Sequence, residues 1–245
     1  MNTAALLCSV VFFVHSPFAQ DGQIKITPAM QRYRDYRIQN TEPSFGLAKV
    51  KRLIAKIKPV GKPDSDTEIA ATSAWSRLST PEKFTYCMLH GEVYSQNCDA
   101  MPWIVDEEHK VFGQISSPFG DEFWSDRQRS FLKSHRGEVI RLLRTTIREK
   151  RRVGVNLKDT ISDLGAYELI PDLVSAYNRD HRDQDILTVL FLLMKEGKYK
   201  PFLSSITYKK LYGPDSNYQS FIVANEANQK LSIDRAMAYY RTRVK

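Results

Sequence analysis

Cysteine and histidine side chains gather in one stretch of the sequence. The residues there whose types could do chemistry are Cys87, His90, Cys98, Asp99 and His109. Thiolate and imidazole groups suit tetrahedral zinc, so the two cysteines and the two histidines could supply a ligand set. A histidine near Cys98 could instead act as the base that converts this thiol into a nucleophilic thiolate.

A disulfide between Cys87 and Cys98 is the third and simplest interpretation of this stretch. Cys8 lies within an expected leader peptide, so these two cysteines are the ones left in an exported chain. An even pair of cysteines in an oxidising compartment usually forms a disulfide. The stretch has neither a standard zinc-finger spacing nor a cysteine-protease signature. We therefore predict a disulfide, and we predict no metal, no cofactor and no catalytic residue.

Other catalytic motifs are missing from the sequence. It contains no nucleophile elbow, no HExxH pair, no P-loop and no dinucleotide-binding fingerprint. Among the carboxylates only Glu122 has an aromatic setting, between Phe119 and Trp124. Hydrolysis of a glycoside would need a second carboxylate facing it. The prediction is a non-catalytic protein, and a hydrolase-type enzyme that uses the region of Cys98 and His109 is the alternative.

The start of the chain has the pattern of a targeting segment. An apolar run from Ala4 to Val14 is followed by Ser16–Gln20, where cleavage after Ala19 would leave Gln20 at the new terminus. We predict that residues 1–19 are a signal peptide and that the product is periplasmic or secreted, and soluble or peripheral. A buried N-terminal helix or strand is the alternative.

The net charge of +8 is concentrated between Gly22 and Pro63, where ten basic residues stand against two acidic ones. Residues 20–43 carry few apolar side chains and are predicted to form an extended or poorly ordered lead-in. Within 44–58, apolar residues recur at helical spacing and basic residues take the other positions, which predicts an amphipathic helix. Its basic residues are Lys49, Lys51, Arg52, Lys56 and Lys58.

This basic helix has two interpretations. A helix of this kind can lie on an anionic membrane or in the groove of a partner, with its five basic side chains at the anionic surface. More often it docks its apolar face on its own domain and leaves the cations solvated, and we favour that interpretation.

A second basic cluster lies at the end of a predicted helix, where positive charge meets the helix dipole favourably. Its members are Arg148, Lys150, Arg151, Arg152 and Lys158. Nucleic acid is not expected as a partner of an exported protein, so this cluster is interpreted as structural. The acidic run at 106–109 is interpreted as a solvated surface.

Residues 68–245 are predicted to form a helical globular domain, and a subdivision into 68–152 and 153–245 is the alternative. Ser79 and Ser125 each begin a capping box, which predicts two helix starts. A further helix is predicted over 137–151. The segment from 91 to 120 is aromatic and rich in turn residues, which predicts irregular structure with a short strand at 111–115.

The C-terminal half is expected to pack around a buried helix at Ile186–Met194, framed by Asp183 and Asp185 before it and Gly197 after it. A buried strand is the alternative.

Helices are also predicted at 156–165, 169–177 and 202–211, and terminal helices at 218–228 and 231–243. The paired pattern over about 156–211 resembles HEAT-like α-helical repeats, although its repeat is shorter than theirs. An ordinary antiparallel helical bundle fits equally well.

The sequence as a whole predicts a mostly α-helical protein with an irregular middle and a C-terminal half of helical hairpins. Its expected role is that of an exported binding or scaffold module, with a protein or an anionic surface as partner. This expectation comes from fold class and therefore names no particular partner.

Overall fold

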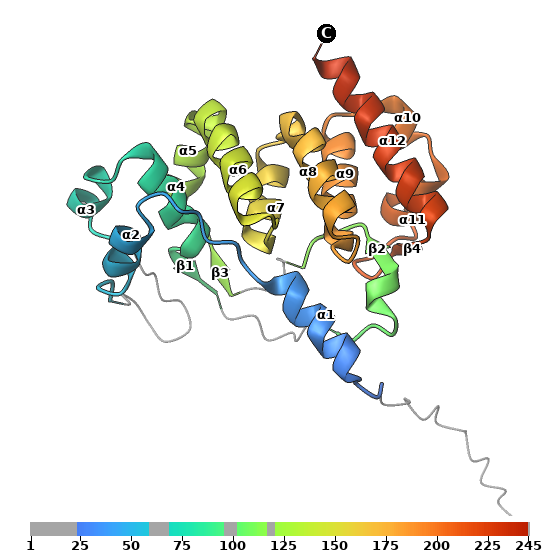
Figure 1. Ribbon diagram of the computed structural model, residues 1–245, viewed down its shortest axis with the longest axis horizontal. Helices are drawn as coiled ribbons and strands as arrows, with labels where there is room; N and C mark the ends of the chain where they lie inside the picture. The colour runs from blue at the N-terminus through green and yellow to red at the C-terminus, as the bar shows by residue number, and fades with distance from the viewer. Residues whose placement is uncertain (1–23, 59–68, 96–101, 117–120, 245) are drawn as a thin grey trace, which may run out of the picture.

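The computed structural model of the protein describes residues 24–58, 69–95, 102–116 and 121–244. The fold is mostly α-helical, as predicted, with two small two-stranded sheets (Figure 1). The predicted signal peptide, Cys98 and Asp99 lie outside the described residues. None of the described helices is long and apolar enough to cross a membrane.

Stacked helices make up the C-terminal half of the molecule (Figure 1). They are α5 (Asp126–Ser134), α6 (Arg136–Lys150), α7 (Val155–Asp163), α8 (Ile170–Arg179), α9 (Gln184–Glu196) and α12 (Glu226–Arg243). Helix α6 packs on α7 and α8 packs on α9, and these two pairs stack through α6 on α8 and α7 on α9. The short helices α10 (Lys200–Leu203) and α11 (Ile206–Tyr212) follow α9 along the chain.

Helix α9 lies at the centre of this stack, so the predicted buried helix is confirmed and the strand alternative is wrong. Its side chains from Gln184 to Phe191 are all buried. It contacts α7, α8, α10, α12 and a strand of the small sheet. Burying each large apolar side chain contributes roughly 1.5–3 kcal/mol, so this helix supplies much of the core.

The strands join distant parts of the chain. Strand β1 (Val93–Tyr94) pairs with β3 (Glu122–Phe123), and β2 (Lys110–Phe112) pairs with β4 (Phe221–Val223), both antiparallel. The predicted strand at 111–115 is confirmed in its first part.

The predicted helix at 218–228 is wrong. Ile222 is buried opposite Val111 in the sheet, which holds this segment extended. The side chain of Asn225 then accepts a hydrogen bond from the backbone N–H of Asn228 and fixes the start of α12.

Both predicted capping boxes are present. Ser79 caps α4 (Thr80–Leu89) with Glu82 as its reciprocal partner, and Ser125 caps α5 with Gln128. Each box satisfies backbone N–H groups that a helix start leaves without partners.

The lead-in expected at 20–43 to be extended contains a helix, α1 (Pro28–Ile38), so that prediction is wrong over these residues. Thr27 caps the helix, and its buried side chains are Met30, Tyr33 and Arg37. A single apolar side chain, a tyrosine and an arginine make no apolar pattern in the sequence, which is why the helix was not expected.

The predicted amphipathic helix is α2 (Leu47–Ile54), and its apolar face packs inside the protein. Val50 is fully buried beside Leu78 and Tyr86, close to the small helix α3 (Thr72–Ser76). This is the docked arrangement that we favoured.

The basic face of α2 is partly neutralised. Exposed Lys49 pairs with Glu82 and exposed Lys51 pairs with Glu42, and Arg52 is exposed as well. The helix is shorter than the predicted 44–58, so the exposed Lys56 and Lys58 follow its end. Contact of this face with an anionic surface stays a prediction.

The chain between α1 and α2 is fixed to the start of α7. The backbone N–H of Gly154 donates to Thr41 Oγ1 at 2.8 Å. Asn156 exchanges two hydrogen bonds with the backbone of Thr41, both of 2.9 Å, and donates to the carbonyl oxygen of Met88 at 2.7 Å. One asparagine thus joins three segments of the chain.

Replacing Gly154 with alanine tests this close approach. An added Cβ would lie 2.3 Å from the backbone nitrogen of Thr41 and 2.6 Å from the carbonyl carbon of Asn40, so backbone would have to move. We expect Gly154→Ala to lower the free energy of unfolding by about 2 kcal/mol, as measured by urea denaturation.

Gly137→Ala in α6 is the matched control, because nothing lies within 4 Å of its added Cβ. Alanine there is expected to be neutral or to stabilise by up to about 1 kcal/mol through its helix propensity. Equal stability of Gly154→Ala and the parent protein would contradict the close approach.

Candidate binding groove

A groove of about 1260 Å³ opens beside α7. Its walls come from the end of α4, strand β3 and the residues after it, residues 114–116, and the last turns of α9. Arg34 and Ile38 on α1, and Asn40 after it, complete one edge. Because its walls come from segments far apart in sequence, the groove exists only in the folded chain.

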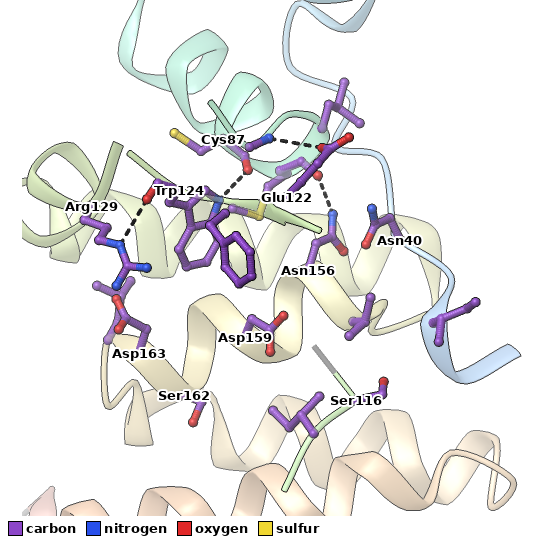
Figure 2. A pocket seen from close by; sticks show the side chains of 18 of the residues that line it. Asn40, Cys87, Ser116, Glu122, Trp124, Arg129, Asn156, Asp159, Ser162 and Asp163 are labelled. Atoms are coloured by element: carbon purple, nitrogen blue, oxygen red, sulfur yellow. Dashed lines mark hydrogen bonds between the residues drawn. The ribbon is translucent and has the colours of Figure 1, made fainter. Parts of the chain in front are cut away.

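One wall of the groove is aromatic. Pairing of β3 with β1 brings Phe123 and Trp124 to the groove, and Trp124 Nε1 donates to the carbonyl oxygen of Cys87 at 2.8 Å. Glu122 lies on the same side and accepts a hydrogen bond from the backbone N–H of Gly91 (Figure 2). Fixed aromatic side chains of this kind offer large, rigid contact area to a ligand.

Helix α7 forms the facing wall. Asp159, Ser162 and Asp163 lie on the side of this helix toward the groove (Figure 2). Their spacing of three and four residues places them on one helix face. Leu157 and Ile161 point the other way and are fully buried in the core, so core packing sets the direction of the polar face.

Ser116 is a buried polar residue of the groove. Its side chain lines the groove, the residue is only 6% exposed, and Oγ has no hydrogen-bond partner among the described residues. A buried hydroxyl without a partner costs roughly 1–3 kcal/mol. A bound ligand with a hydrogen-bonding group at this point would remove that cost.

The groove is acidic although the chain is basic. Five carboxylates and two guanidinium groups line it, in a chain of net charge +8. The guanidinium of Arg34 lies 3.7 Å from the ring centroid of Trp103 and donates to the carbonyl oxygen of Pro102. Arg129 Nε donates to the carbonyl oxygen of Trp124 at 3.1 Å. The cations are therefore engaged with the protein.

The edge of the groove on α1 is held by buried charges. Arg37 donates from Nε and Nη2 to the two carboxylate oxygens of Asp185, at 3.0 and 2.7 Å, and from Nη1 to Glu107. Burial by itself raises the pKa of Asp185, but the charges of Arg37 and Lys158 outweigh it and lower the pKa. Asp185 is thus held as an anion at the start of α9.

A second buried ion pair lies beside the first. Lys158 on α7 is only 1% exposed and its Nζ lies 2.5 Å from Asp183. Asp183 and Asp185 stand at the start of α9, as predicted, and in addition they bind cations of α7 and α1. Lys158, assigned in the sequence to a basic cluster, therefore serves an internal ion pair.

The residues predicted to do chemistry are not brought together. Cys87 and His90 line one end of the groove, whereas His109 is exposed on the short helix η1 (Glu107–His109) and does not line it. Cys98 and Asp99 lie outside the described residues. Among the described residues no group of three or more His, Cys, Asp or Glu side chains is placed to hold a metal ion.

Cys87 is a free and buried thiol in the structure. Burial raises the pKa of this thiol, so it stays protonated and is a poor nucleophile. The structure shows no disulfide among the residues it describes, and because Cys87 is free it does not bear out the predicted pairing with Cys98.

Most of the groove could not be found in the sequence. The aromatic setting of Glu122 beside Trp124 was a signal, and both residues line the groove. Asp159, Ser162 and Asp163 carried none, because polar residues at this spacing occur on any solvated helix face.

The described residues form a mostly α-helical fold with an acidic groove that has one aromatic wall. No protein-family model matches the chain, and searches among curated proteins and among solved structures gave no match. Its function is therefore inferred from the groove itself.

The reactivity of Cys87 gives a direct test of its burial. In a chain that begins at Gln20 and carries Cys98→Ser, Cys87 is the remaining cysteine. We expect this thiol to be silent toward Ellman's reagent in the native protein at mildly alkaline pH and to react fully in guanidinium chloride. Its reaction should be no faster than opening of the fold.

Ser130→Cys in the same background is the positive control, because Ser130 is exposed on α5. Its added thiol should react at once. Rapid reaction of Cys87 in the native protein without Ser130→Cys would show that the thiol is accessible and would reopen the nucleophile hypothesis.

Proposed function

We propose that this protein is an exported, non-catalytic helical module that binds a segment of a protein partner in the groove beside α7. The observation that carries the proposal is Ser116, a lining residue of the groove whose buried Oγ has no hydrogen-bond partner among the described residues. Native proteins rarely leave such a group unpaired, and a binding site is one reason for doing so.

The make-up of the groove supports binding of an extended chain. Sites for ligands are concave and largely apolar, with a few placed polar groups. Here the side chains of Phe123, Trp124 and Leu192 supply apolar area, and Ser116 and Asp159 supply polar groups. The volume of about 1260 Å³ exceeds what a small metabolite needs and suits several residues of a peptide.

A non-catalytic role is supported by the protonated state of the Cys87 thiol, which was the candidate nucleophile within the described residues. The thiol of Cys87 is protonated through burial, and His109 does not line the groove. The hydrolase-type alternative would depend on Cys98, which lies outside the described residues.

Export and repeat character remain parts of the proposal. The apolar run from Ala4 to Val14 and the small residues after it support a signal peptide. Packing of α7, α8 and α10 on α9 supports a likeness to HEAT-like repeats over about 156–211, a class whose concave faces commonly bind protein segments.

Selection from a random peptide library tests the proposed function. The protein is immobilised, clones are selected, and each is titrated against the parent and against Ser162→Trp, which places a large ring in the groove. We expect to recover clones that bind Ser162→Trp at least about tenfold more weakly than the parent protein, because the added tryptophan ring occupies their site. Ser130→Trp, on the exposed face of α5, is the matched control and should change nothing.

If Ser162→Trp lowers the midpoint of thermal unfolding, a second blocking variant is used. This variant is Asp163→Trp, because Asp163 is exposed on the groove wall. Recovery of no clones, or of clones that bind both blocking variants as tightly as the parent, would rule out the groove as a peptide site.

A further inference from the structure

We infer that the groove takes a cationic segment, in which an arginine side chain enters between α7 and the aromatic wall and apolar residues flank it. This inference rests on the proposed function and adds the chemistry of the occupant. It is carried by the charge of the groove, its aromatic side chains and the hydroxyl of Ser116, which has no partner among the described residues.

The first support is charge complementarity. Asp121, Glu122, Asp159, Asp163 and Glu196 all line the groove. The two lining guanidinium groups are already engaged with backbone carbonyl oxygens of the protein. Those hydrogen bonds leave the guanidinium charges in place, but five carboxylates outnumber them and the described lining carries a net negative charge. A partly enclosed acidic cleft attracts cations and repels anions.

The second support is the placing of carboxylates on two sides. Asp159 and Asp163 lie on α7, and Glu122 lies across from them on β3 (Figure 2). Carboxylates therefore line both walls of the groove. A planar guanidinium with several N–H donors uses such an arrangement better than a compact ammonium does.

The third support is the aromatic wall. Trp124 and Phe123 both line the groove, and Trp124 is held by its hydrogen bond to the carbonyl oxygen of Cys87. Arginine stacks readily on aromatic rings. Such stacking is present at the edge of the groove itself, where the guanidinium of Arg34 lies 3.7 Å from the ring centroid of Trp103.

The fourth support is independent of charge. Ser116 Oγ is buried in the groove and unpartnered among the described residues. A hydroxyl oxygen can accept a hydrogen bond from a guanidinium N–H or from the backbone N–H of a bound segment. Ile115 and Leu192 line the groove as well, which favours apolar residues next to the arginine.

Defined peptides test the inference. Three fluorescein-labelled peptides share a leucine, glycine and serine framework and carry two arginines, two citrullines or two glutamates at the same places. Citrulline keeps the shape of arginine and removes its charge. Binding to the parent protein is measured by fluorescence anisotropy. We expect the arginine peptide to bind, the citrulline peptide to bind at least about tenfold more weakly, and the glutamate peptide not to bind.

Substitutions in the groove test whether the arginine peptide binds there. Glu122→Gln and Asp163→Asn should each weaken the arginine peptide about threefold to tenfold and leave the citrulline peptide unchanged. Asp215→Asn is the matched control, because Asp215 is exposed and does not line the groove. Raising the salt concentration should weaken only the arginine peptide.

Two outcomes overturn the inference. Equal affinity for the arginine and citrulline peptides would show that charge does not select the occupant, and failure of the arginine peptide to bind would exclude a cationic occupant of this kind. In either case the proposed function still stands if library clones depend on the groove, and it falls with the inference if none do.

Discussion

The buried guanidinium of Arg37 is the interaction on which the arrangement of the groove depends. It is only 3% exposed and pairs with Asp185 on α9 and with Glu107 on η1. Removing such charges from water is costly, and only close, well-directed pairing offsets that cost. The pairing fixes a polar helix against the most apolar helix of the chain. Through it, Arg34 and Ile38 reach the edge of the groove.

Two kinds of force therefore act on different parts of the site. Hydrophobic burial holds α7 on α9 but is non-directional. Hydrogen bonds and ion pairs, such as those of Arg37 and Asn156, decide where the segment from α1 to α2 lies. The basic residues of that segment lie on the outer surface or pair internally, while carboxylates collect in the groove. A basic protein can thus contain an acidic groove.

Features that depend on neighbours in sequence could be predicted, and features that depend on distant partners could not. The apolar run of α9 and the two capping boxes are local patterns, and the structure has them. Helix α1 was missed because Arg37 is buried through partners 148 and 70 residues away. Glu107, expected on a solvated surface, is fully buried for the same reason. The groove combines one detectable signal, at Trp124, with a wall on α7 whose polar face is like that of any exposed helix.

A double-mutant cycle on Arg37 and Asp185 tests most directly whether this ion pair holds the site together. The free energy of unfolding is measured in urea for the parent, Arg37→Met, Asp185→Asn and the double variant, with exposed Arg32→Met as control. We predict that Arg37→Met lowers it by about 3–5 kcal/mol, because two carboxylates lose their partner. The double variant should lose at least about 1 kcal/mol less than the sum of the single losses. Strictly additive losses, or a loss for Arg37→Met no larger than for Arg32→Met, would contradict the account.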